Sequence, residues 1–185
     1  MANSVYTYVT VEFVTEEQAT QFLNTIHPGG SLDSIISEHI FPGLENTREA
    51  WIDTVGAKWC FVHDVDTYST TVTMQLESAW SFPEDLILAI TAIARKTPGF
   101  RTLLANYEDE GLCFIGAFGA TQTDIRDDEE TWEDLRSMFC EVNGLDAEND
   151  DLEVTAEPHG DEFREFVDGR IEALREYVET DLTEE

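Results

Sequence analysis

The chain has 185 residues, and its 42% hydrophobic and 11% aromatic content is enough to bury a core, which argues against a disordered protein. Forty acidic residues against ten Lys and Arg give a formal net charge of −30, which argues against direct binding to nucleic acid or to anionic membranes. Three cysteines without a CxxC pair, no signal-peptide pattern and no run of about 20 apolar residues predict a cytoplasmic protein without a disulfide framework.

Strand and helix patterns alternate through the first 120 residues. Residues 5–14 alternate β-branched and aromatic side chains, which predicts a strand, and Thr15 with Gln18 predicts the capped start of a helix. The predicted order is strand 5–14, a helix from Thr15 to Pro28, an irregular stretch to residue 46, helix 47–55, strands 59–65 and 69–80, a helix from Pro83 to Pro98, and strands 100–107 and 112–118.

This order predicts an α+β fold. A β-α-β-β-α-β core is the ferredoxin-like arrangement, an antiparallel sheet with two helices on one face. We therefore expect a ferredoxin-like domain over residues 1–120 and an acidic, mainly helical C-terminal region over residues 121–185.

The C-terminal region carries two helical patterns. Asp127 to Glu130 is predicted to open a helix that ends at Asn143-Gly144. Residues 145–153 read as an acidic linker or a short strand. Residues 161–178 repeat apolar side chains at intervals of three and four, with acids on the opposite face, which predicts an amphipathic helix.

Three strings in the first 120 residues resemble the Api-ninety-two-like family of phage and conjugative-plasmid proteins. They are Trp51-Ile52 with Gly56-Ala57-Lys58-Trp59, then Ser78-Ala79-Trp80-Ser81-Phe82-Pro83, then Tyr107-Glu108-Asp109-Glu110-Gly111 with Phe114-Ile115-Gly116. The resemblance implies a ferredoxin-like domain and an origin on a mobile element, and it supplies no activity and no catalytic residues.

No motif for catalysis or for a cofactor stands out. Four histidines are scattered singly, and no nucleophile elbow, P-loop or dinucleotide turn is present, so we predict no enzyme activity, no cofactor and no metal site. The acidic run that starts at Asp146 has calcium-loop spacing, but Asp151 stands where the sharp turn needs glycine. A hydrolase built from clustered carboxylates and a divalent metal is the least favoured reading.

The acids are unevenly distributed. Residues 1–104 hold 13 acidic and 5 basic residues, whereas residues 105–185 hold 27 and 5. A helix with acids three and four residues apart carries one charge per roughly 4.5–6 Å, and one strand of duplex DNA carries one phosphate per roughly 3.4 Å. Such a helix can occupy a basic channel that normally holds DNA or RNA.

We therefore predict a nucleic-acid mimic, a monomer or homodimer, that binds a basic host defence protein such as a CRISPR effector complex or a restriction enzyme. The predicted partner-binding residues are Asp124, Asp127, Asp128, Glu129, Glu130, Glu133, Asp134, Glu148, Asp150, Asp151, Glu162, Glu165, Asp168, Glu172, Glu176 and Glu179. The alternative is an assembly module that binds its partner through aromatic side chains, with the acidity serving solubility or adaptation to high salt.

Overall fold

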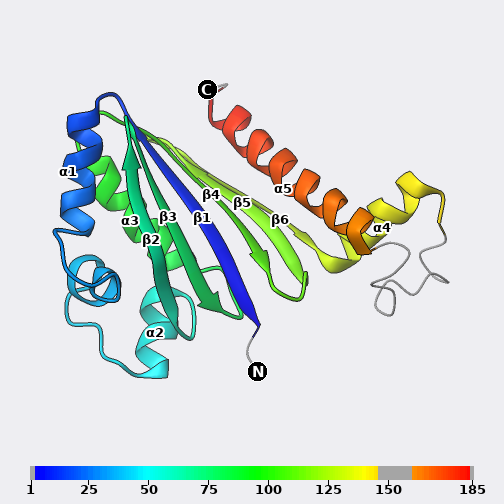
Figure 1. Cartoon of the computed structure of the whole chain (residues 1–185), viewed down its shortest axis with the longest axis horizontal. Helices are drawn as coiled ribbons and strands as arrows, with labels where there is room; N and C mark the ends of the chain where they lie inside the picture. Colours follow the sequence, from blue (N-terminus) through cyan, green and yellow to red (C-terminus); the bar gives the residue numbers. More distant parts are fainter. Residues whose placement is uncertain (1–2, 146–159, 184–185) are drawn as a thin grey trace.

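A six-stranded antiparallel sheet in the order β2-β3-β1-β4-β5-β6 runs through the computed structural model, which describes residues 3–145 and 160–183 (Figure 1). The strands are β1 (Ser4–Phe13), β2 (Cys60–Tyr68), β3 (Thr71–Ala79), β4 (Phe100–Asp109), β5 (Phe114–Ala120) and β6 (Ile125–Thr131). The helices are α1 (Glu16–Ile26), the π-helix η1 (Ile35–Ile40), α2 (Arg48–Val55), α3 (Glu84–Lys96), α4 (Trp132–Asn143) and α5 (Gly160–Thr183). The predicted α+β class with an antiparallel sheet is confirmed.

One face of the sheet is covered by α1, η1 and α3. Alternation along β1 buries Val9, Val11 and Phe13 on this side, where they pack against Phe22 of α1 and Ile90 of α3. The predicted cap of α1 is confirmed as a capping box between Thr15 and Gln18. This larger core therefore comes almost entirely from residues before position 121.

The opposite face carries a second core under α5. The sheet contributes Leu104, Ile115 and Ala117, and the helices contribute Leu135, Phe139, Phe163, Val167, Leu174, Val178 and Leu182. Gly119 permits a close approach, because a Cβ there would lie 2.5 Å from Cγ1 of Val178. The acidic C-terminal helices are thus anchored by an apolar layer on β4 and β5, and α5 also contacts β6.

The prediction for Asp127 to Glu130 is wrong in its secondary structure. These residues do not open a helix; they lie in β6, where Phe118 pairs with Asp127 and Gly116 with Glu129. Asp and Glu disfavour strands, but charged residues on an edge strand prevent pairing with another chain. The helix begins five residues later than the start of that run, at Trp132, with Thr131 as its N-cap.

The predicted boundary at residue 120 falls between two paired strands. Because β6 completes the sheet and α5 covers β5, independent folding of residues 1–120 stays a prediction.

Across the described ranges 3–145 and 160–183, no helix is both long and apolar enough to cross a membrane.

Candidate protein-binding surface

One face of α5 carries a line of exposed carboxylates. They recur three or four residues apart and define the acidic stripe, which consists of Glu162, Glu165, Asp168, Glu172, Glu176 and Glu179. From its first to its last member the stripe is about 25 Å long, with one carboxylate per roughly 5 Å. The structure therefore places the α5 members of the predicted site together on one surface.

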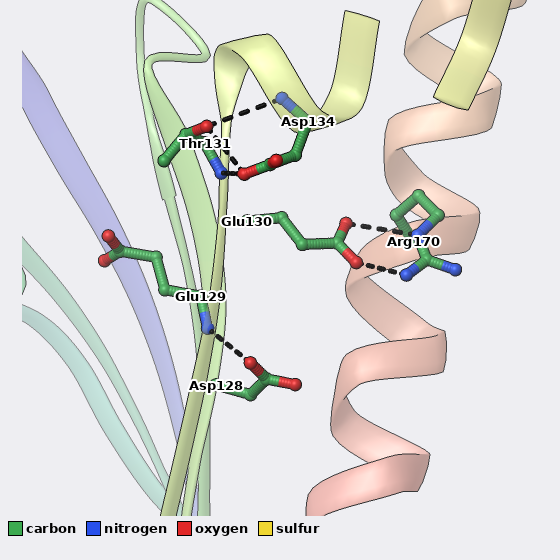
Figure 2. Close-up of polar contacts among 6 residues, drawn as sticks. All are labelled: Asp128, Glu129, Glu130, Thr131, Asp134 and Arg170. Carbon is green, nitrogen blue, oxygen red and sulfur yellow. Dashed lines mark hydrogen bonds and ion pairs between the residues drawn. The ribbon is translucent and has the colours of Figure 1, made fainter. Parts of the chain in front are cut away.

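Arginines hold α5 against the sheet from both sides. Arg170 makes a two-pronged pair with Glu130 of β6, in which Nε donates to Oε2 over 3.1 Å (Figure 2). Arg164 Nη2 donates to Glu108 Oε2 of β4 over 2.7 Å. Asp181, near the end of α5, pairs with an arginine of β6. These pairs and the apolar layer fix the orientation of the stripe before any partner binds.

Internal cations neutralise only part of the stripe. Arg164 Nε lies 2.9 Å from Asp168, and Arg175 Nη1 lies 4.0 Å from Glu172. Among the described residues, Glu165, Glu176 and Glu179 form no ion pair. The stripe therefore keeps uncompensated negative charge at Glu165, Glu176 and Glu179.

The predicted acids of β6 face in two directions. Figure 2 shows Glu129 pointing away from α5, on the opposite side of the strand from Glu130 and its partner on the helix. Asp127 and Glu129 both accept from the Tyr107 hydroxyl, over 3.4 and 3.3 Å. Partial loss of hydration, followed by the charge of Glu84, raises the pKa of Asp127; loss of hydration also raises the pKa of Glu129.

These β6 acids do not extend the stripe. Asp127 and Glu129 belong to the α3 side of the sheet, and the Glu130 carboxylate is occupied by its ion pair. Asp128 accepts from the Glu129 backbone N–H over 3.1 Å. Asp127 and Glu129 are therefore separated from the α5 stripe, and Glu130 is committed to its ion pair with Arg170.

Two more of the predicted acids, Asp134 and Asp124, also have local partners. Asp134 accepts from the N–H and hydroxyl of Thr131 over 3.0 and 2.7 Å, which lowers the pKa of Asp134 (Figure 2). Glu133 is exposed in the same turn, and Asp124 accepts from the Thr123 hydroxyl in the β5–β6 turn. Glu148, Asp150, Asp151 and the calcium-like segment 146–157 lie outside the described residues.

Sequence reasoning gave no residues for a second surface, on the part of the sheet that α5 leaves uncovered. Here Tyr6 and Tyr8 of β1 are 45% and 46% exposed, and Phe61 of β2 is 49% exposed. Between this sheet surface and α5 lies a groove of about 450 Å³, lined by Tyr6, Thr7, Tyr8, His63, Gln75, Leu76, Asn106, Glu108, Arg164, Asp168 and Ile171. Alternation in residues 5–14 was the available signal, because it puts both tyrosines opposite the buried valines.

Titratable groups elsewhere have structural explanations. His63 Nε2 lies 2.6 Å from Glu77, whose pKa is lowered first by the Ser4 hydroxyl and then by His63. Burial raises the pKa of the Cys60 thiol to about 12, so this thiol stays protonated at neutral pH. In the part of the chain that the structure describes, no group of three or more His, Cys, Asp or Glu could hold a metal ion.

Comparisons with known proteins found no match among protein-family models, curated proteins or solved structures. The resemblance to the Api-ninety-two-like family stays a prediction that rests on its three strings.

Proposed function

We propose that this protein is a non-catalytic inhibitor that places the α5 stripe in the nucleic-acid-binding site of a basic partner. The observation that carries the proposal is the stripe itself: exposed carboxylates on one helical face, about 25 Å long. A partner that normally neutralises phosphates with Lys and Arg would exchange those contacts for carboxylates. Release of counterions from both surfaces would favour binding, as it does for DNA.

The way α5 is held supports this role. A helix that is already fixed on its own apolar layer loses little conformational freedom when it binds, so more of the electrostatic attraction is retained as affinity. Glu165, Glu176 and Glu179 are exposed, while Arg164 and Arg170 pair with Glu108 and Glu130 of the sheet.

For the partner class we infer a host defence protein, a CRISPR effector complex or a restriction enzyme. The support is the family resemblance, which implies a mobile element, together with the charge. The strand order β2-β3-β1-β4, with α1 and α3 on one face, supports a ferredoxin-like unit that β5 and β6 extend.

A second candidate is an assembly module that binds through its aromatic surface, with acidity that serves solubility or salt adaptation. The exposed side chains of Tyr6, Tyr8 and Phe61 favour it. Under this alternative, partner binding depends on the tyrosines and is insensitive to neutralisation of α5.

The test is a set of DNA-cleavage assays with a CRISPR effector complex and a restriction endonuclease, each titrated with the full chain. Replacing Glu165, Glu172, Glu176 and Glu179 by Gln is expected to weaken inhibition about 30-fold, because several small exposed ion pairs are lost together. The matched control neutralises four exposed acids far from α5: Glu17, Glu38, Glu45 and Asp53.

Raising salt from about 50 to 200 mM is expected to weaken inhibition by the unmodified chain at least tenfold. Equal effects of the two variant sets, inhibition that salt does not change, or no inhibition of either enzyme would each count against mimicry.

A further inference from the structure

On the uncovered part of the sheet, each of two tyrosines has a polar residue opposite it on both neighbouring strands. Across the strands, Tyr6 stands between Glu77 of β3 and Glu108 of β4. Tyr8 stands in the next row, between Gln75 and Asn106. Because both tyrosines are about half exposed, each ring offers an open aromatic surface beside an acid or an amide.

The wall of the groove already holds one guanidinium. Arg164 of α5 bridges Glu108 of β4 and Asp168 of its own helix, at 2.7 and 2.9 Å. Two acids, Glu108 and Asp168, line the groove against this one arginine, so the groove has an excess of negative charge. It is therefore complementary to a cationic ligand.

The chemistry favours arginine over lysine. A guanidinium is planar, stacks on aromatic rings and donates paired hydrogen bonds to a carboxylate or an amide oxygen. An ammonium group acts as a compact point charge and lacks this planar geometry. Tyr6 and Tyr8 lie two residues apart on one strand, about 6.6 Å. Alternate residues of an extended peptide repeat at the same distance.

We propose that the groove between α5 and strands β4, β1, β3 and β2 binds an extended segment of a partner that carries arginines at alternate positions. One guanidinium stacks on Tyr6 and pairs with Glu108; the next stacks on Tyr8 and donates to the Gln75 or Asn106 amide oxygen. The proposal rests on the proposed function only for the basic character of the partner, and it assigns a second contact beside the α5 stripe.

Charge argues against two other occupants. A second copy of the chain would bring together two molecules that each have a formal charge of −30, and a single-stranded nucleic acid would bring its phosphates toward the same field. Both are nevertheless outcomes that the experiment can detect.

The experiment titrates the full chain with a seven-residue peptide that alternates glycine and arginine, and with its lysine counterpart, while backbone amide NMR shifts are recorded. The arginine peptide is expected to shift amides of β1 and β3 around Tyr6, Tyr8 and Gln75. The variant Tyr6→Thr with Tyr8→Thr keeps strand-compatible residues and is expected to bind about tenfold more weakly, through the loss of two cation–ring contacts. The lysine peptide is expected to bind more weakly than the arginine peptide.

The matched control is the stripe variant Glu165→Gln with Glu176→Gln and Glu179→Gln, which is expected to keep the same pattern of shifts and most of the affinity. Equal weakening in the stripe variant, equal binding of the lysine peptide, or shifts outside the groove would overturn the proposal. So would binding of a single-stranded oligothymidylate that the tyrosine variant loses, or a dimer in sedimentation that the tyrosine variant dissociates.

The two proposals fail separately. If the tyrosine variant binds the arginine peptide as tightly as the unmodified chain, while the unmodified chain still inhibits DNA cleavage, the groove proposal is wrong and mimicry stands. If the arginine peptide binds as expected but the stripe variant still inhibits DNA cleavage fully, mimicry is wrong and the groove proposal stands.

Discussion

On the face of the sheet where α5 lies, two halves belong to one continuous antiparallel sheet but differ in what covers them. The half built from β4, β5 and β6 presents Leu104, Ile115, Ala117 and Gly119, and α5 packs directly on it. The half built from β1, β3 and β2 presents Tyr6, Tyr8 and Gln75, and it is exposed. In Figure 1, α5 accordingly lies toward the β6 end of the sheet, away from β2.

The difference shows that the shape and polarity of the side chains on a sheet face, not strand pairing, decide where a helix can pack on it. Small and aliphatic residues let α5 approach closely, and tyrosines with a polar tip tolerate water on one side. The uncovered half is therefore a surface suited to contact with another molecule, because its aromatic rings remain accessible while its polar atoms stay solvated.

The contrast between the two halves can be tested by removing one large side chain from each. Leu174→Ala in the layer under α5 is expected to lower the free energy of unfolding by about 2–5 kcal/mol, through lost burial and the cavity left behind. Tyr8→Ala on the exposed half removes little buried area and is expected to cost about 1 kcal/mol or less. Urea unfolding followed by circular dichroism measures both, and similar losses would show that the halves are not distinct.

Much of the fold could be predicted because its signals are local. The alternation of residues 5–14, the Thr15–Gln18 capping box and the Gly56 end of α2 all appear in the structure where the sequence indicated them. The amphipathic pattern at residues 161–178 also corresponds to a helix, although α5 extends further at its C-terminal end. Each of these patterns depends on neighbours within a few residues.

What the sequence did not reveal depends on contacts between distant segments. The run Ile125–Thr131 has the acidity of a helix start, and only pairing with β5 makes it a strand. Likewise, no local pattern could tell that α5 covers β4, β5 and β6 and leaves Tyr6 and Tyr8 exposed. For the candidate site, helical spacing was enough to group the α5 acids. That Glu129 and Glu130 face opposite sides of the sheet could be seen only once these residues were known to lie in a strand.

A second experiment compares the ion pair under α5 with an exposed ion pair between β4 and β1, where the two halves meet. Glu130→Gln breaks the two-pronged pair with Arg170 under α5, where the Glu130 side chain is only 13% exposed, and it is expected to cost about 1–3 kcal/mol of unfolding free energy. Arg101→Gln breaks the Arg101–Glu12 pair, in which both side chains are over 40% exposed, and the expected cost is under about 1 kcal/mol. Urea midpoints at low and high salt measure the difference, and the reverse order would contradict the idea that Arg170 helps to hold α5.

The smallest expected effect concerns the side of β6 that faces away from α5. Partial loss of hydration and the charge of Glu84 raise the pKa of Asp127 above its usual 3.8, so the folded chain binds this proton more tightly than the unfolded chain. Ionised Asp127 therefore destabilises the fold above its raised pKa, and the penalty shrinks as pH falls through that pKa and vanishes below 3.8. Asp127→Asn is expected to raise the unfolding free energy at pH 7 by less than about 1 kcal/mol, with the gain lost below pH 3.8. Its amide oxygen can still accept from Tyr107.

The matched control is Asp64→Asn, an exposed position on the edge strand at the other end of the sheet. Both changes remove one negative charge from a chain of formal charge −30, so both relieve the same general repulsion. Only Asp127 adds the local penalty, and the difference between the two variants in urea unfolding at pH 7 and at pH 3.5 isolates it. If the two variants gain equal unfolding free energy at pH 7, Asp127 carries no local penalty beyond the repulsion that comes from the overall charge of the protein.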